Sequence, residues 1–188
     1  MKIDELLILD NIKNKVIAFP TDTVYGVGCL IDDELSIKRI YELKKRDQDK
    51  PLAILVGSIE QANDIVKALP KKAVELMEKH WPGALTIVCE KNDNVPSFLN
   101  PLYKTIGIRM PKSNIALAIL QKYGPMAVTS VNKSGEAPLN TFDEINNAYQ
   151  NEIDYIIESN ESSSNVSSTV IEINQENIKV IRQGNIII

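Results

Sequence analysis

The chain has 188 residues, of which 44% are hydrophobic, 24% are charged and 5% are aromatic. This length suffices for one domain with a full core, and the composition excludes disordered, collagen-like and disulfide-scaffold proteins. Lysine and arginine together number 21 against 25 acidic residues, which gives a formal net charge of -4. That balance excludes a globally basic protein that wraps nucleic acid, but it leaves a local basic patch open.

The two cysteines, Cys29 and Cys89, lie in separate apolar stretches and have no cysteine or histidine at metal-ligand spacing. We expect both to be buried, reduced thiols. The N-terminus carries acidic residues where a signal peptide needs a basic end, and no apolar run is long enough to cross a bilayer. These features predict a cytoplasmic protein with no membrane partner.

Helical and strand patterns alternate early in the chain, and strands cluster late. The apolar spacing predicts helices at 2–12, 33–45, 58–68, 71–79, 113–122 and 142–150. Short apolar runs predict strands at 16–19, 52–56, 85–88, 106–109, 126–129 and 153–157, then three more, the last at 185–188. Segment 158–168 is rich in Ser, Asn and Glu and is expected to be a mobile loop. The pattern predicts an α/β fold with a mixed sheet, and residues 1–188 are expected to form a single domain.

Polar side chains crowd the end of the first predicted strand, where Pro20 is followed by Thr21, Asp22, Thr23 and Tyr25. Small polar groups at a strand exit often line a pocket in α/β folds. The same residues could instead form a tight turn that caps its own backbone. Composition alone leaves the two interpretations level.

Segment 38–50 holds six basic and three acidic side chains, a local positive surplus in an acidic protein. It suits phosphate oxygens, but a run of this kind is more often a solvated helix face. Its place before a predicted strand favours a pocket slightly. Arg109 stands inside an apolar strand and therefore needs a carboxylate or phosphate partner, which is either an internal Asp or Glu or the carboxylate of a ligand.

The remaining polar features are weaker. His80 is the only histidine and has no partner for a metal site or a catalytic triad. Its segment is therefore expected to form a turn in which Trp81 packs into the core. Segments 129–136 and 167–170 offer hydroxyl and amide groups after predicted strands, and Arg182 precedes Gly184. The absence of GxxxxGK[ST] and GxGxxG motifs excludes ordinary P-loop and Rossmann phosphate binding.

Seven segments, taken in order, resemble the threonylcarbamoyl-AMP synthase family of YrdC-like proteins. They are PTDTVYG at 20–26, KxR at 44–46 with KPL at 50–52, WPGxLT at 81–86, GIRMP at 107–111, SVNKSG at 130–135, STV at 168–170 and RxG at 182–184. The resemblance implies a twisted mixed sheet flanked by helices, with a concave basic face, in the short single-domain form.

By the same resemblance, the chain would condense L-threonine, bicarbonate or carbon dioxide, and ATP into threonylcarbamoyl-AMP and pyrophosphate. A partner complex would then transfer the threonylcarbamoyl group to tRNA. The resemblance also implies which residues bind substrates. ATP would be held by Lys44, Arg46, Thr105, Asn132 and Arg182, and threonine by Thr23, Arg109, Ser130 and Ser168. Such chemistry needs positioning and charge neutralisation, so no catalytic nucleophile and no protein-built metal site are expected, although Mg²⁺ would accompany ATP.

Four positions depart from the family pattern: Lys45 replaces a common glycine, and Asp47, Ala84 and Ser167 each replace a common proline. Loop conformation is expected to change at these sites, and Lys45 is expected to alter the charge at the pocket mouth. Two other functions remain open. One is an RNA-binding module that uses segment 38–50 and the concave face, and the other is a paralogue that acts on another carbamoylated substrate.

Overall fold

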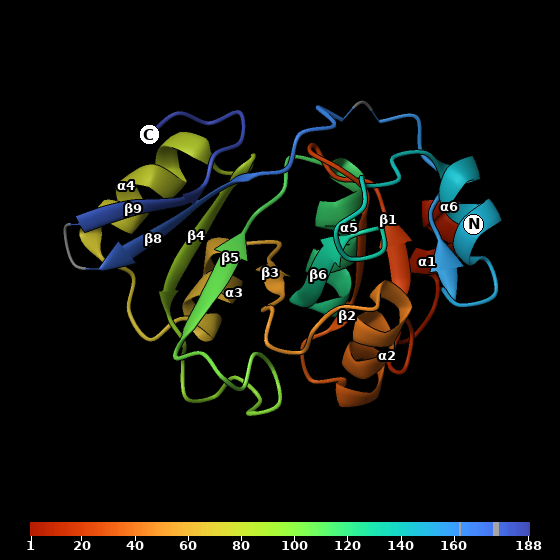
Figure 1. Cartoon of the computed structure of the whole chain (residues 1–188), viewed down its shortest axis with the longest axis horizontal. Helices are drawn as coiled ribbons and strands as arrows, with labels where there is room; N and C mark the ends of the chain where they lie inside the picture. The colour runs from red at the N-terminus through yellow and green to blue at the C-terminus, as the bar shows by residue number, and fades with distance from the viewer. Residues whose placement is uncertain (162, 175–176) are drawn as a thin grey trace.

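Among the described residues, nine strands form one mixed sheet in the order β7-β1-β2-β6-β3-β5-β4-β8-β9 (Figure 1). The structure is a computed structural model, and it describes residues 1–161, 163–174 and 177–188. The strands are β1 (Ile17–Phe19), β2 (Gly26–Leu30), β3 (Ala53–Leu55), β4 (Leu85–Glu90), β5 (Thr105–Arg109), β6 (Met126–Ser130), β7 (Tyr155–Ile156), β8 (Thr169–Asn174) and β9 (Asn177–Arg182). The helices are α1 (Ile3–Leu7), α2 (Glu34–Lys44), α3 (Ile59–Ile65), α4 (Lys71–His80), α5 (Asn114–Tyr123) and α6 (Phe142–Tyr149).

Parallel and antiparallel pairs are mixed across the sheet, which confirms the predicted mixed α/β fold. Strand β5 lies parallel to β3 and antiparallel to β4, and β4 in turn lies parallel to β8. Parallel neighbours need a crossover connection, and the connection from β3 to its parallel neighbour β5 contains α3, α4 and β4. Strands that are distant in sequence therefore come to lie side by side at the centre of the sheet.

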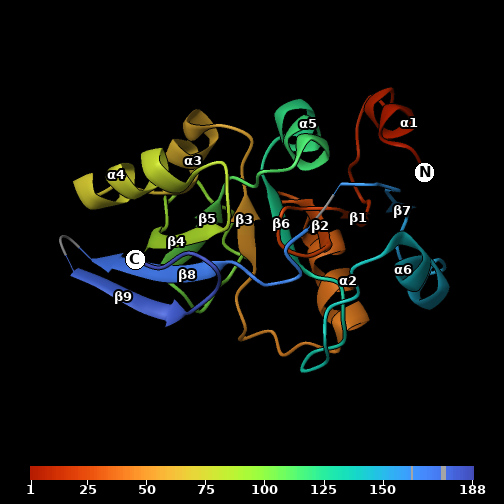
Figure 2. The ribbon, with the colours of Figure 1, turned by 90° about the horizontal axis from the view of Figure 1, so that it is seen from above.

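Helices α1, α3, α4 and α5 lie along one side of the sheet in Figure 2, whereas α2 lies on the opposite side near β2. Buried side chains of α1 and α5 form a core cluster with β1, β3 and β6. A larger cluster joins α2, α3, α4 and α6 to strands β1 to β8. In the described residues, no helix covers β5, β4 and β8 on the side away from α3 and α4 (Figure 2). A cavity opens on this side of the sheet.

Two predicted elements were wrong in extent or kind, and one strand, β2, was not predicted. The first helix ends at Leu7, and Ile8 is 79% exposed, so the apolar stripe does not continue to residue 12. The glycine-rich segment after the first strand forms β2, because Gly28 allows the close approach of Val128, whose Cγ2 would lie 2.6 Å from an added Cβ. Residues 185–188 form no strand, since the backbone N–H and C=O of Ile186 instead pair with the Thr169 side chain.

The expected loop at 158–168 contains no helix or strand among its described residues, and Ser162 within it lies outside them. Both cysteines are free and buried, as predicted, and burial raises the pKa of Cys89 to about 11. Over the described part of the chain, every helix is too short or too polar to span a bilayer.

The departure at Lys45 from the family's glycine has a structural cost. Lys45 ends α2 in the left-handed conformation, with φ 47° and ψ 45°. A side chain in this conformation is strained, so Lys45→Gly is expected to raise the free energy of unfolding by about 0.5–1 kcal/mol, after the extra flexibility of glycine in the unfolded chain is counted. Thermal denaturation should show an increase in Tm of about 2 °C. Lys45→Ala, which removes the charge but keeps Cβ, should give no such gain; an equal gain would assign the effect to charge repulsion.

Candidate functional site

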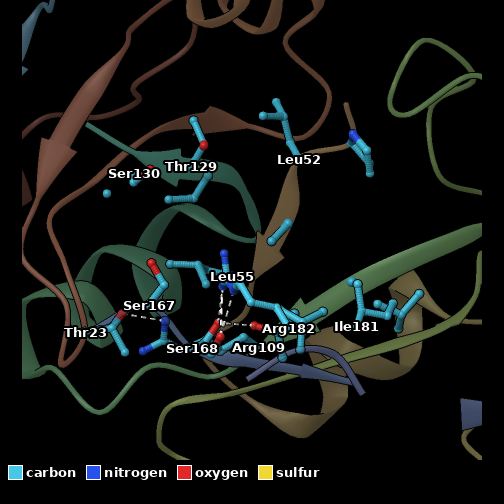
Figure 3. A pocket seen from close by; sticks show the side chains of 18 of the residues that line it. Thr23, Leu52, Leu55, Arg109, Thr129, Ser130, Ser167, Ser168, Ile181 and Arg182 are labelled. Carbon is cyan, nitrogen blue, oxygen red and sulfur yellow. Dashed lines mark hydrogen bonds between the residues drawn. The ribbon is translucent and has the colours of Figure 1, made fainter. Parts of the chain in front are cut away.

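A cavity of about 600 Å³ opens on the helix-free side of the sheet, a volume typical of small-molecule sites (Figure 3). Its walls come from several strands and from the loops that follow them. The polar and charged residues that line it are Thr21, Thr23, Arg46, Thr86, Tyr103, Thr105, Arg109, Thr129, Ser130, Ser167, Ser168, Glu172 and Arg182. The apolar lining includes Leu52, Ala53, Val88 and Val128.

Strand alternation explains how these residues reach one surface. In β5, Thr105, Gly107 and Arg109 line the cavity, whereas Ile106 and Ile108 are at most 1% exposed and pack in the core. Successive side chains of a strand point to opposite faces, so every second residue contributes to the site. The neighbouring strands β4 and β8 follow the same rule. Their cavity-facing residues are Thr86 and Val88, and Val170 and Glu172.

Arg109 is held by three protein groups at one end of the cavity. Its Nε donates to Gly83 O at 2.9 Å, Nη1 donates to Thr23 Oγ1 at 2.7 Å, and Nη2 pairs with Asp22 Oδ1 at 2.5 Å. The residue is 6% exposed, and burial lowers the pKa of its guanidinium while Asp22 opposes that shift. An internal acid thus satisfies the predicted need for a partner. These three bonds use three of the five guanidinium N–H groups, and two remain for a ligand.

Arg182 and Ser168 form a second polar group beside Arg109 (Figure 3). Arg182 donates from Nε and Nη2 to Ser168 O at 3.1 and 2.9 Å, and from Nη2 to Ser168 Oγ at 3.1 Å. Ser168 Oγ also lies 2.8 Å from Thr86 Oγ1. In the described structure, Arg109 is the one cavity arginine in an ion pair with a carboxylate. The positive charges of Arg46 and Arg182 are therefore not neutralised by a protein carboxylate and remain available to an anionic ligand.

Lys44 is 1% exposed and does not line the cavity. Its ammonium donates to Ser130 O at 2.5 Å, Asn132 O at 2.7 Å and Asn132 Oδ1 at 3.0 Å. The backbone N–H of Ser134 donates in turn to Lys44 O at 2.8 Å. Lys44 thus joins the end of α2 to the last residue of β6, Ser130, and to the loop that follows it. Ser130 itself lines the cavity.

Burial gives Lys44 a distinctive pH dependence. Desolvation, with a smaller effect of Arg46, lowers the pKa of the Lys44 ammonium from 10.5 to about 8. Between about pH 8 and 10.5 the unfolded chain keeps this proton and the folded protein releases it, so the lysine's contribution to stability rises with pH. The free energy of unfolding of the wild type, minus that of Lys44→Met, should therefore increase from pH 8 to pH 10 in urea titrations. A constant difference would show that the folded and unfolded pKa values are equal.

Seven of the nine predicted site residues line the one cavity: Thr23, Arg46, Thr105, Arg109, Ser130, Ser168 and Arg182. Lys44 and Asn132 lie behind it and contact each other. Lys45 lines a separate cavity with Glu42, Lys133, Glu136 and Tyr149, among others, so the expectation that it alters the charge at the pocket mouth was wrong.

The basic segment 38–50 does not form a continuous patch. Lys38 pairs with Glu34, Arg39 with Asp154, and Lys50 with Asp47, each within 2.9 Å, and Lys44 is buried. Arg46 alone of this segment's basic residues reaches the cavity, and it donates to the carbonyls of Lys50 and Pro51. The weaker candidate His80 lies outside the cavity lining, and Trp81 is buried with its Nε1 bonded to Leu85 O.

Several cavity residues were given no role from the sequence. Thr86, Glu172 and Tyr103 line the cavity, and Asp22, which the sequence placed only in a polar segment after a strand, is the partner of Arg109. Alternation within the strands 85–90 and 169–174 could have placed Thr86 and Glu172 on one face with Arg109, but only once the strand order was known.

Comparison with known proteins agrees with this arrangement. Residues 12–184 match the model of the Sua5/YciO/YrdC family, which is described as "Telomere recombination". The chain belongs to this family. It is 35% identical over 175 residues to a threonylcarbamoyl-AMP synthase from Pyrococcus abyssi, covering 93% of this chain and 52% of that protein.

Two solved structures of the Sua5/YciO/YrdC family share the fold. P. abyssi Sua5 complexed with L-threonine superposes with a TM-score of 0.86 at 36% identity, over 90% of this chain and 50% of that one. Escherichia coli YciO gives a TM-score of 0.82 at 28% identity, over 91% of this chain and 84% of that one. The chain spans about half the length of the P. abyssi synthase.

Proposed function

We propose that the chain is an L-threonylcarbamoyladenylate synthase, which condenses L-threonine, bicarbonate or carbon dioxide, and ATP. One observation carries the proposal: a single cavity brings three arginines, Arg46, Arg109 and Arg182, together with the hydroxyls of Thr23, Ser130 and Ser168. The reaction must hold several negative groups in one place, and this set supplies positive charge and hydrogen bonds for them. The P. abyssi relative complexed with L-threonine supports threonine as the amino acid.

The two ends of the cavity suit the two larger substrates. The unused N–H groups of Arg109 fit the α-carboxylate of threonine as a fork, close to Thr23. Arg46, Arg182 and Thr105 would contact the phosphates of ATP. The adenine ring would pack on the aliphatic part of the lining, which consists of Leu52, Ala53, Val88 and Val128.

The chemistry then requires positioning more than a protein nucleophile. The threonine nitrogen forms a bond to the carbon of carbon dioxide and loses a proton, which gives a carbamate. A carbamate oxygen attacks the α-phosphorus, and the bond from that phosphorus to the bridging oxygen of pyrophosphate breaks. Arg46 and Arg182 would stabilise the charge that builds on the phosphoryl oxygens. The product is threonylcarbamoyl-AMP, which a partner complex would use to modify tRNA.

Magnesium would enter with ATP rather than through a protein-built site. Among the described residues, no group of three or more His, Cys, Asp or Glu side chains could hold a metal ion. The cavity lining includes one carboxylate, Glu172. These residues do not form a cage for Mg²⁺, and no step of the proposed reaction is assigned to the metal.

ATP–pyrophosphate exchange tests the proposal. Exchange should require both L-threonine and bicarbonate, and L-valine should not replace threonine. Arg182→Gln should lower the exchange rate by about 100-fold, because it removes a positive charge beside the phosphates. Lys38→Gln is the matched control, since Lys38 is exposed and pairs with Glu34 outside the cavity, and its exchange rate should be that of the wild type. Exchange that ignores threonine would contradict the proposal.

Neither alternative function gains a specific observation. RNA binding through segment 38–50 is weakened, because three of its cations pair with local carboxylates and Lys44 is buried. A paralogue acting on another carbamoylated substrate would differ in the amino-acid end of the cavity, and the exchange assay with valine addresses that possibility.

A further inference from the structure

The chain just before β3 is held by a side chain and not by a neighbouring strand. Leu52 precedes β3 and lies outside the register of β3 with β5 and β6, yet it is 2% exposed. A buried backbone N–H or C=O without a partner is costly, so both groups of Leu52 need one. Among the described residues, the side chain of Asn100 supplies both partners.

Asn100 pairs with Leu52 as a residue of an adjacent strand would. Its Oδ1 accepts from Leu52 N at 2.9 Å, and its Nδ2 donates to Leu52 O at 2.9 Å. A side-chain amide offers a donor and an acceptor side by side, and this pair fixes which of them faces which backbone group. A side chain with only acceptors, or with no polar atom, cannot make both bonds.

The connection between β4 and β5, drawn in green at the lower edge of Figure 1, holds Asn100 in place. Asn100 is 3% exposed and adopts the left-handed conformation, with φ 51°. Its C=O accepts from Lys91 Nζ at 3.2 Å and from Tyr103 N at 3.1 Å. The backbone N–H of Lys91 donates to Lys104 O at 2.8 Å and closes the loop. The loop therefore presents the Asn100 amide at a defined position.

The segment that Asn100 holds also orients Arg46. Arg46 Nε donates to Lys50 O at 3.2 Å, and Nη2 donates to Pro51 O at 3.1 Å. The C=O of Pro51 and the N–H of Leu52 belong to one planar trans peptide, in which they point in opposite directions. Asn100 thus bonds to one edge of this peptide and Arg46 to the other, so a rotation of the peptide would break both bonds.

We propose that Asn100 is a positioning residue for the nucleotide: it fixes the Pro51–Leu52 peptide and thereby aims the Arg46 guanidinium at the phosphates. Asn100 is absent from the cavity lining, whereas Arg46 and Leu52 line it, so Asn100 acts through them. The inference rests on the proposed function, in which Arg46 contacts ATP. Threonine binding should not depend on Asn100, because Thr23 and Arg109 lie on other segments.

Calorimetry with ATP and, separately, with L-threonine on Asn100→Gly tests the inference. Glycine adopts the left-handed conformation without strain, so the variant removes the amide but keeps the course of the backbone. The Kd for ATP should rise about tenfold, because the hydrogen bonds of Arg46 to phosphate are weakened. The Kd for threonine should stay within about twofold of the wild type.

A double-mutant cycle with Arg46→Met distinguishes positioning from a general loss of structure. Arg46→Met alone should also raise the Kd for ATP about tenfold. Addition of Asn100→Gly to Arg46→Met should raise it by less than about twofold more, because the guanidinium to be positioned is gone. A merely structural role of Asn100 would instead give the same factor in both backgrounds.

Asn14→Gly is the matched control, since Asn14 is also left-handed, with φ 61°, and lies outside the cavity lining. It should keep the wild-type Kd for ATP. Should Asn100→Gly fail to fold, Asn100→Asp replaces it: it keeps the acceptor for Leu52 N but places an oxygen against Leu52 O, and should weaken ATP binding in the same way.

The inference is overturned if the folded Asn100 variant binds ATP as the wild type does, or if its effect and that of Arg46→Met multiply in full. Equal losses of ATP and threonine affinity would overturn it as well. A wild type that binds no ATP would refute the proposed function, and the inference with it.

Discussion

Replacing Arg109 by methionine is expected to lower kcat/KM for threonine by about 1000-fold or more, and to leave the Kd for ATP within about threefold. The large loss follows because the two free N–H groups of Arg109, a residue that is 6% exposed, would bind the substrate carboxylate away from bulk water. ATP should still bind, since Arg46 and Arg182, which would contact its phosphates, are unchanged. Initial rates of pyrophosphate release and calorimetry with ATP measure the two effects.

The same substitution also leaves the half-buried Asp22 without its ion-pair partner, which is expected to cost about 2–3 kcal/mol of stability, less than for a fully buried pair because the Asp22 side chain is 17% exposed. The double variant Asp22→Asn with Arg109→Met separates binding from folding. It removes both charges, and the amide oxygen that Asp22→Asn introduces can still accept the bond that Lys112 N–H donates to Asp22 Oδ1. Stability should largely recover in the double variant, whereas threonine activity should not. Recovery of both would show that Arg109 acts only on the fold, and a parallel loss of ATP affinity would show that the division of the cavity is wrong.

Gly184→Ala is expected to weaken the binding of both substrates and to destabilise the protein by about 1–3 kcal/mol. An added Cβ at Gly184 would lie 2.3 Å from Ser167 O and 2.5 Å from Thr169 N, so backbone must move. The segment that moves carries Ser168, which faces the threonine end of the cavity and accepts from Arg182. Calorimetry should show that the Kd values for threonine and ATP rise together, by about tenfold.

Gly124→Ala provides a contrasting control. Gly124 has a positive φ of 101°, and an added Cβ would meet nothing within 4 Å. The substitution therefore introduces backbone strain at a point outside the cavity lining, and should reduce Tm without changing either Kd. If Gly184→Ala lowers Tm but keeps both Kd values, the contact between Gly184 and 167–169 is structural only.

The central strands and the polar residues on them were predictable, because buried apolar runs and their polar exits are local features of the sequence. Arg109 was recognised as needing a partner from its apolar neighbours alone. Its partner Asp22 was not, since the two residues are 87 positions apart and their contact depends on strand order. Strand β2 was missed because its two glycines favour a turn when the strands beside it are unknown.

The role of Lys44 illustrates a different limit. Resemblance places it among ATP-binding residues, and lysines are almost never fully buried, so an exposed side chain was the natural expectation. In the structure Lys44 is 1% exposed and donates to Ser130 O at the end of β6 and to Asn132 in the loop that follows. At Lys45 the sequence showed only that a lysine replaces a glycine common in the family. The structure explains that glycine, because residue 45 adopts the left-handed backbone conformation that glycine accommodates without strain.

The central claim is that this cavity makes threonylcarbamoyl-AMP, and mass spectrometry of the reaction with ¹³C-bicarbonate tests it most directly. The purified chain, with ATP, L-threonine and labelled bicarbonate, should yield threonylcarbamoyl-AMP that carries one ¹³C atom, together with an equal amount of pyrophosphate. Omission of threonine, or its replacement by L-valine, should abolish the product. A wild-type protein that forms no labelled adenylate, or forms one equally well from valine, would contradict the account.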